Sequence, residues 1–505
     1  MLFWKKREKA PYHPKQVPKF NLPLTRESIQ NVFAEAGDFV HRKVLLGGNS
    51  KWALDLFFID GMVSGTTVNE SVIRPLANGV MYDSEASPSQ VIRNLREGGV
   101  YNGTVQTRTT VDEVVFDLVN GFCVLLVEKQ KVALSFETKT NEKRSVSEPT
   151  VENVMKGAKD ALVETLRTNT SLVRRHLRTP DLQIREYLIG RQTYTKVAVI
   201  SIGGLTNEAL VQTVLERLKA MDVDGALSGA VLEEYLTQNI KTPFPLMLYT
   251  ERTDRFAAGL LEGRVGVLVD GLPIGYLLPS TLAHFMIAPD DRENNYMQAT
   301  MIRVVRYIAL WINILVPGFY IAVSTFHQEM IPTALMHSII ESKQNVPFPT
   351  VFEVLGLLLA FEILQEAGLR LPNVIGQTVS IIGGLVVGQS AVEAKILSPV
   401  IIIVVAVTGI AGYTIPNRDF AGAVRIWRFL IAFASAVLGL FGTATAGLAL
   451  VYHLAQLESF GVPYLSPFTA KEAGSNDGNG AVRPPLKDTK YREADLRPRN
   501  IRRRK

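Results

Sequence analysis

The chain has 505 residues, of which 47% are apolar, and it carries a net charge of +6. This length is too great for one compact soluble domain and predicts two to four structural units. The single cysteine, Cys123, excludes an intrachain disulfide framework and a cysteine-based metal cluster.

The N-terminal region is polar and begins with a short arm. Residues 1–25 are charged and rich in proline, without the apolar stretch of a cleavable signal peptide. We therefore expect a flexible arm, followed by a soluble region that stays in the cytoplasm. Residues 26–148 form a first predicted subdomain. Its apolar runs predict strands at 52–60, 122–127 and 131–136 and a helix at 69–76.

A second soluble subdomain is predicted at residues 191–295, after a charged helical connector at 149–190. Its predicted elements are a strand at 196–202, helices at 207–221, 227–238 and 253–262, and paired strands within 264–278. Because strands and helices alternate in both subdomains, we expect an α/β soluble region.

The two subdomains resemble each other in sequence. Phe58–Met62, followed by Asn69, parallels Ser201–Leu205, followed by Asn207. The run 118–128 is matched by a similar run 142 residues later. A strand, turn and helix in this order also arise by chance in mixed proteins, but the ordered recurrence favours two similar tandem subdomains.

Residues 296–457 are far more apolar than the rest and predict a polytopic α-helical membrane domain with four to six helices. The run Pro399–Pro416, for example, has no charged residue. Predicted spans are 302–325, 378–397, 400–415 and 424–455, with a weaker one at 350–364. The weaker span would be about 22 Å long, short of a hydrocarbon core of about 30 Å.

The last predicted span is too long for one straight crossing. It must tilt, protrude or kink near Gly439, Gly442 or Gly447. The positively charged residues also give conflicting indications of the side of the membrane on which the C-terminal tail lies. Arg303, Arg306 and the arginine-rich tail place both ends in the cytoplasm, whereas Arg425 and Arg428 at the start of the last span would put the tail outside. We favour both ends inside, because the tail carries more charge.

The C-terminal tail, residues 471–505, is rich in glycine, proline and charge and is predicted to be disordered. Residues 483–505 hold ten Lys or Arg and three Asp or Glu, so they carry +7 and the rest of the chain −1. Nucleic acid is therefore a poor partner for the folded part. A basic tail beside membrane helices marks the cytoplasmic side or touches anionic membrane lipid.

The sequence carries no motif of nucleotide binding, serine hydrolysis or zinc proteolysis. His327, Glu329 and His337 lack the spacing of metal ligands on a helix, so no metal site is predicted. We also predict no cofactor, no catalytic residues and no enzymatic activity.

Carboxylates within the apolar block are the candidate functional residues. Glu353 and Glu362 lie in the short span 350–364, and Gln389 and Glu393 share one helix face farther on. A carboxylate facing lipid is costly, so such groups line an aqueous path or bind a cationic side chain. Both readings remain open.

The candidate pore residues are Glu353, Leu357, Ala360 and Glu362, in the short span 350–364. Glu353 and Glu362 are nine residues apart, about 180° around a helix, so they cannot both face one pore axis. The sequence does not tell which carboxylate face lines the path.

Several segments resemble the A subunit of GerA-type spore germinant receptors. They are Thr325–Thr333, Val346–Pro349, Phe361–Pro372, Ile375–Gly383, Gly388–Ala394 and Phe460–Phe468, with Glu148–Thr150, Leu166–Asn169, Tyr249–Arg255 and Glu262–Val265 upstream. The resemblance covers residues 50–468, makes 458–470 an end segment typical of the family, and leaves the first 25 residues and the tail outside.

The resemblance implies a multi-pass protein of the spore inner membrane. It implies partners, namely a transporter-like B subunit that binds the nutrient and a lipoprotein C subunit. It further implies a homo-oligomer, arranged as a ring, that acts as a nutrient-gated cation channel and triggers germination. Which nutrient is sensed does not follow from this chain.

Two other functions are compatible with the sequence. A secondary transporter would carry its own substrate, but the apolar block shows no inverted repeat. A membrane-anchored scaffold would recruit partner subunits, but it would not need carboxylates within the membrane.

Overall fold

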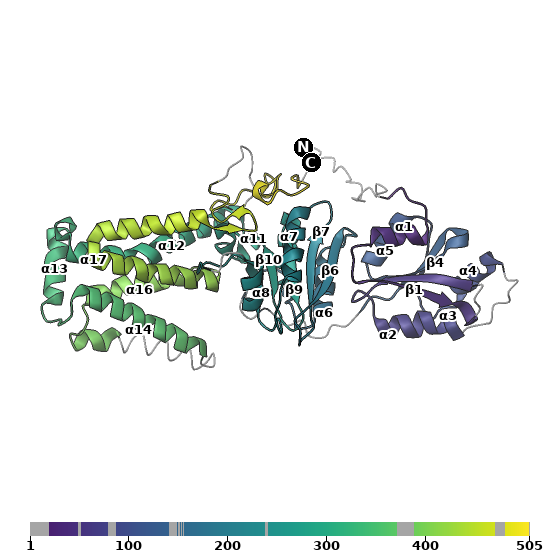
Figure 1. Ribbon diagram of the computed structural model, residues 1–505, viewed down its shortest axis with the longest axis horizontal. Coiled ribbons are helices and arrows are strands. Elements are labelled where there is room, and N and C mark those ends of the chain that lie inside the picture. Colours follow the sequence, from purple (N-terminus) through teal and green to yellow (C-terminus); the bar gives the residue numbers. More distant parts are fainter. Residues whose placement is uncertain are drawn as a thin grey trace, which may run out of the picture.

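The computed structural model describes residues 20–48, 52–78, 87–140, 156–237, 241–370, 388–469 and 480–503, with single residues 149, 152 and 154. Three parts follow one another along its longest axis (Figure 1). A first sheet with its helices lies at one end, a second sheet lies in the middle, and a bundle of helices lies at the other end.

The first part is a five-stranded antiparallel sheet. Its strand order is β1 (Phe39–Leu45), β2 (Ala53–Ile59), β4 (Phe122–Val127), β5 (Val132–Glu137) and β3 (Val105–Arg108). Its helices are α1 (Arg26–Val32), α2 (Gly65–Thr67), η3 (Val68–Ile73), α3 (Arg74–Asn78), α4 (Pro88–Glu97) and α5 (Val111–Val119). The central strand β4 is buried along its whole length, because helices cover both faces of the sheet.

The second part repeats this design. Its sheet has the order β6 (Leu182–Ile189), β7 (Thr195–Ile202), β9 (Val265–Val269), β10 (Gly275–Leu278) and β8 (Leu248–Thr250). Its helices are α6 (Leu166–His176), α7 (Glu208–Lys219), α8 (Gly229–Leu236), α9 (Thr253–Glu262), α10 (Leu282–Phe285) and α11 (Asp290–Glu293). The strand order matches that of the first sheet element by element, as expected for two similar subdomains.

The prediction of a helical connector at 149–190 is wrong in part. Its described residues include α6, but they also include β6, which is the edge strand of the second sheet. Strand β6 mixes buried residues with partly exposed ones, as an edge strand with one solvated face does.

Residues 35–38 join the two sheet domains. The Gly37 amide donates to the Ile184 carbonyl of β6 at 2.8 Å, and the Ile184 amide donates to the Glu35 carbonyl at 3.1 Å. Beside this pairing, Arg174 of α6 binds Asp38 through two guanidinium nitrogens, and both side chains are buried. The joint therefore contains a fully desolvated ion pair.

The third part is helical. Its described helices are α12 (Tyr296–Thr325), α13 (Thr333–Lys343), α14 (Thr350–Arg370), α16 (Pro399–Tyr413) and α17 (Arg418–Gln456). Among the described residues, α12 and α17 are long and apolar enough to cross a membrane, and α16 is a shorter apolar helix. The first half of the predicted span 378–397 lies outside the described residues, and its second half is helical only at residues 388–393.

Helix α14 is longer than predicted. It continues past Leu364 to Arg370, because five of the six added residues (Gln, Glu, Ala, Leu and Arg) have high helix propensity, which outweighs the single Gly368. Its 21 residues measure about 31 Å, which removes the predicted shortfall in length.

Helix α17 reverses direction at Gly439, where φ is 62° and ψ is −140°. The side chains of Ser435 and Thr443 hydrogen-bond across the turn at 2.7 Å, and the rings of Trp427 and His453 lie 5.6 Å apart. In one straight helix these rings would be about 39 Å apart. The kink predicted near Gly439 is therefore confirmed in place, and it is a complete hairpin.

This hairpin brings both ends of α17 to the same end of the helical bundle. Both ends of α17 lie against the second sheet domain, because Phe244 contacts Phe420 at the start and His453 near the end. The tip at Gly439 instead packs on Phe326, past the far end of α12. Arg425, Arg428 and the tail therefore belong to one end of the bundle.

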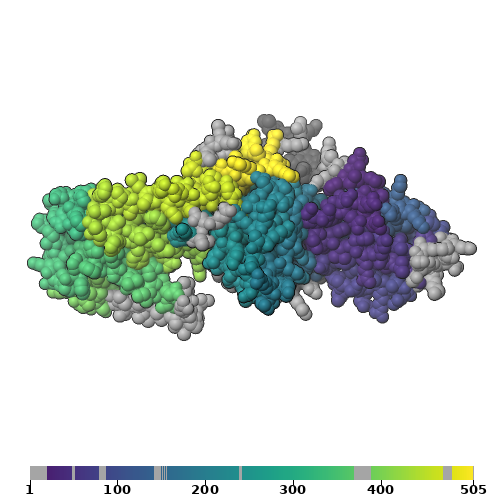
Figure 2. Space-filling model, viewed as in Figure 1, coloured from purple at the N-terminus to yellow at the C-terminus, as the bar shows by residue number. Residues whose placement is uncertain are grey.

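Both predicted flexible ends are partly ordered. Leu24 is buried, and Phe20 packs against the hydrophobic core of the first sheet domain. Residues 20–25 are therefore part of the folded domain and do not form a flexible arm. Residues 480–503, predicted to be disordered, lie across the junction between the second sheet domain and the helices (Figure 2). Ionic contacts hold them there rather than an apolar core.

Candidate functional sites

The structure buries Glu353 at the start of α14. Its Oε2 accepts a hydrogen bond from the Ser398 amide at 2.8 Å, and Ser398 is the N-cap of α16. A carboxylate is stabilised at a helix N-terminus by the partial positive charge there. The ammonium of Lys343 lies 3.9 Å from Oε1, so Glu353 ties α13, α14 and α16 together.

Glu362 faces α17. It accepts a hydrogen bond from Arg425 at 2.8 Å and another from Arg428. Arg428 is buried and Arg425 is partly exposed. Within one chain, Glu353 and Glu362 thus lie on opposite sides of α14, as their spacing predicts, and both bind neighbouring helices.

The outward face of α14 lies between these two carboxylates. Exposed residues recur along it every three or four positions: Phe352, Gly356, Leu359, Ala360, Ile363, Glu366 and Ala367. Of the four pore candidates, Ala360 lies on this face and Leu357 is half-buried beside it. Figure 1 shows α14 at the edge of the bundle.

Gln389 and Glu393 share a helix face, as predicted. The Gln389 amide donates to Glu393 at 2.9 Å, and both side chains are exposed. Among the described contacts, neither Gln389 nor Glu393 binds Glu353 or Glu362.

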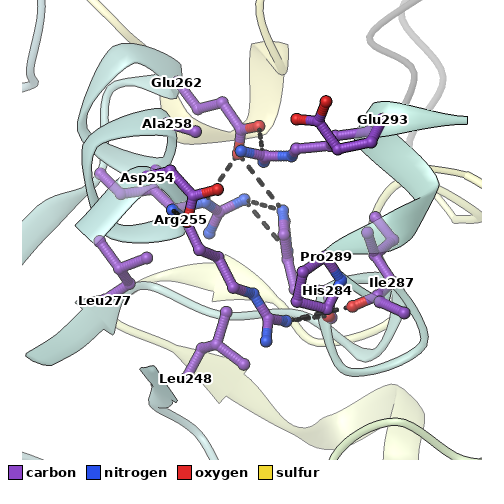
Figure 3. A pocket seen from close by; sticks show the side chains of 14 residues that line it. Leu248, Asp254, Arg255, Ala258, Glu262, Leu277, His284, Ile287, Pro289 and Glu293 are labelled. Atoms are coloured by element: carbon purple, nitrogen blue, oxygen red, sulfur yellow. Dashed lines mark hydrogen bonds and ion pairs between the residues drawn. The ribbon is translucent and has the colours of Figure 1, made fainter. Parts of the chain in front are cut away.

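A second candidate site lies where the second sheet domain meets α10 and α11. A cavity of about 170 Å³ opens there, lined by apolar side chains such as Leu248 and Leu277 and by several charged ones (Figure 3). Arg255 reaches past the cavity to the carbonyl of Ile287 at 3.1 Å. Four segments of the chain thus meet around one small space.

Glu262 is the centre of the charged groups in this cavity. The guanidinium of Arg292 donates to it at 2.7 Å and that of Arg264 at 3.4 Å. Arg264 also donates to Glu493 of the tail at 2.7 Å and to Nε2 of His284 at 2.6 Å. All but Arg292 are buried, so this cluster fastens the tail to the second sheet domain.

The charges fix the protonation states of the cluster. Burial would raise the pKa of the Glu262 carboxyl, but Arg292, His284 and Arg264 lower that pKa well below its usual range. Burial lowers the pKa of His284 to about 3, and the positive charge of Arg264 acts in the same direction. His284 is therefore neutral at pH 7, and its Nε2 accepts a hydrogen bond from Arg264. Such a group is poorly matched to acid–base catalysis near neutrality.

The stability of the chain should fall as the pH drops below about 6.5, in part because of His284. Its pKa is lower in the folded chain than in the unfolded chain, so between these values the unfolded state binds one more proton. One proton gives a slope of at most about 1.4 kcal/mol per pH unit. Thermal unfolding of the full-length chain between pH 8 and pH 5 measures it.

His284→Gln should flatten this dependence, because a glutamine oxygen still accepts from Arg264 but does not titrate. His176→Gln is the control. Hydrogen bonding to Asp160 raises the pKa of His176, so its contribution is lost as the pH rises. An unchanged slope below pH 6.5 in His284→Gln would contradict the assignment.

The sequence did not identify the Glu262 cluster as a site. Glu262 and Arg264 stood in one of the segments that carry the family resemblance, and this was the available signal. Their partners His284 and Glu493 lie 20 and 229 residues beyond Arg264 in the sequence, so no local pattern connects them.

Comparison with known proteins gives consistent matches across the chain. The family model described as Bacillus/Clostridium GerA spore germination protein matches residues 27–494. The chain is 36% identical to spore germination protein KA of Bacillus subtilis (strain 168), over 90% of this chain and 83% of that protein. It is 35% identical to spore germination protein B1 of the same organism, over 90% of this chain and 94% of that protein.

The chain is also similar to a solved structure. It is the crystal structure of the N-terminal domain of the A subunit of the Bacillus megaterium spore germinant receptor GerK3. The match has a TM-score of 0.40 and 29% identity, and it covers 50% of this chain and 92% of that chain.

Proposed function

Because the chain belongs to the GerA family of spore germination proteins, we propose that it is the A subunit of a nutrient germinant receptor and oligomerises into a cation channel. A role in spore germination follows from the family. The chain would act with the B and C subunits of the receptor, and the B subunit would bind the nutrient.

The proposal places α12, α14, α16 and both arms of α17 across the spore inner membrane. Large apolar side chains exposed on α16 and α17, such as Ile410 and Phe433, support this placement, because water disfavours such surfaces and lipid does not. Both sheet domains and the tail would lie on the cytoplasmic side, since both ends of α17 meet the second sheet domain.

The position of α14 is the observation that carries the channel proposal. Its outward face bears small residues at Gly356, Ala360 and Ala367, with the carboxylate of Glu366 toward one end. Small residues let helices approach closely around an axis, and a ring of carboxylates favours cations. Ala360 would line the path, while Glu353 and Glu362 would fix the rotation of α14 by binding α16 and α17.

Cation flux from proteoliposomes tests the proposal. Vesicles that hold the chain with its partner subunits should release potassium ions when nutrient is added, and mass photometry should show several copies of the chain per particle. A monomeric chain, or release equal to that of protein-free vesicles, would contradict it.

A further inference from the structure

A larger cavity lies on the other side of Glu262, between α9, the start of α12 and the C-terminal tail. Its volume is about 360 Å³, within the range of about 300–1,000 Å³ found for small-molecule sites. Its charged lining residues are Glu262, Arg292, Arg303, Arg483, Arg492 and Arg503. Five arginines thus surround it with one glutamate.

Backbone carbonyls hold two of these arginines in place. Arg483 is buried and donates to the carbonyls of Arg292 at 2.9 Å and Asn294 at 2.6 Å, at the end of α11. Arg492 donates to the carbonyls of Leu261 at 2.8 Å and Asn500 at 2.9 Å. Carbonyls orient a guanidinium but do not neutralise its charge.

Among the arginines that line this cavity, Arg503 has nitrogen atoms that donate no hydrogen bond to the described residues. Its Nε and Nη2 atoms are buried and have no hydrogen-bond partner among the described residues. Nη2 lies 3.9 Å from Glu262, beyond hydrogen-bond distance. A buried donor without a partner is costly, so an acceptor in the cavity would stabilise it.

Two of the acidic residues nearby are already paired, and the carboxylates of Asp291 and Glu293 also act on Arg483. Glu262 binds Arg292 and Arg264, and the buried Asp291 binds both Arg303 and Arg306, at 3.2 and 2.6 Å. The positive charge of Arg483, Arg492 and Arg503 therefore remains in excess. Consistent with this, burial and then the charge of Arg503 lower the pKa of Arg492.

We propose that this cavity binds a phosphate group, carried by an anionic phospholipid head group or by a small soluble molecule. Guanidinium groups match phosphate oxygens with paired hydrogen bonds, and several of them around one cavity suit a multiply charged anion. The cavity lies at the first turns of α12, the level at which this helix would enter the membrane. A bound phosphate would link the tail to α11 and α12.

Binding to the full-length chain in phosphate-free detergent tests the proposal. The two probes are short-chain phosphatidylglycerol and inorganic pyrophosphate, each titrated calorimetrically. We expect the chain to bind at least one of them, and Arg503→Gln to weaken binding about tenfold or more, because a charge-assisted hydrogen bond is worth about 1.5–3 kcal/mol. Binding of the lipid alone would identify a head-group site, and binding of pyrophosphate a site for free phosphates.

Arg499→Gln is the matched control. It removes the same charge from the same tail at an exposed position outside the cavity, so it should change affinity less than about twofold. A second variant, Leu486→Glu, keeps all five arginines and puts a carboxylate at the exposed edge of the cavity, where it should also abolish binding. Val482→Glu, exposed outside the cavity, is its control.

The proposal is overturned if neither probe binds the unmodified chain. It is also overturned if Arg499→Gln weakens binding as much as Arg503→Gln, because the tail would then attract anions by net charge alone.

Discussion

Asp38→Ala should loosen the joint between the two sheet domains by about 3–5 kcal/mol, because it leaves the charge of Arg174 buried without a counter-ion. Among the described residues, the carbonyl of Leu182, at 3.4 Å, is the other hydrogen-bond acceptor of this guanidinium. Amide hydrogen exchange in the full-length chain measures the effect. Exchange in β1 and β6 should rise about 100-fold or more, while the α17 hairpin keeps its protection.

Asp60→Ala is the matched control for this joint. Asp60 binds Arg167 at 3.1 Å and also joins the first domain to α6, but its side chain is half exposed. An exposed ion pair contributes about 0–1 kcal/mol, so this variant should have little effect. Asp38→Ala with Arg174→Met, which removes both charges, should recover much of the loss. Equal effects of Asp38→Ala and Asp60→Ala would refute the role of the buried pair.

Glu362→Ala should destabilise the helical part by a similar amount. Arg428 is buried, and its Nε atom already lacks a hydrogen-bond partner among the described residues, so Glu362 is its counter-ion. An unpaired charge inside a helical bundle costs about 3–5 kcal/mol. The thermal midpoint of the full-length chain in lipid nanodiscs measures the loss.

Glu366→Ala, one turn farther along α14 on its exposed face, should change the midpoint little. Adding Arg428→Met to Glu362→Ala should restore part of the stability, because it removes the buried charge as well. If Glu362→Ala leaves the midpoint unchanged, Glu362 does not hold α14 against α17.

The sequence predicted the buried strands better than the edge strands. Strand β4 was predicted with its observed bounds, Phe122–Val127, because all its residues are apolar and buried. The edge strands β1 and β6 were missed, since each mixes charged residues into its pattern and presents one face to water. In the sequence, the similarity of the two subdomains could be recognised only from the apolar runs that form their buried strands.

Long-range partners explain what the sequence could not predict in the helical part. Spacing showed that Glu353 and Glu362 face opposite sides of α14, but the residues that bind them are 45 and 66 positions away. Hydropathy read α17 as one overlong span, because a single glycine with positive φ reverses the chain without changing its composition. Gly439 was among three glycines that could do so.

The tail was predicted to be disordered because it lacks apolar residues for a core. Instead, Arg483 and Glu493 fix it by hydrogen bonds and ion pairs to α11 and Arg264. The composition of the tail shows that it cannot form an apolar core of its own. It does not show that the charges of the tail complement those of a surface distant in the sequence.

Thiol modification of Ala360→Cys during flux is the most direct test of the proposed channel. The native Cys123 is buried, so a charged methanethiosulfonate reagent should leave the unmodified chain unaffected. In proteoliposomes with the partner subunits, the reagent should block nutrient-triggered potassium release through Ala360→Cys, because the added group would occupy the path lined by α14. The control Ile410→Cys, exposed on α16, should stay open. Unblocked release through a modified Ala360→Cys would contradict the placement of α14 along the path.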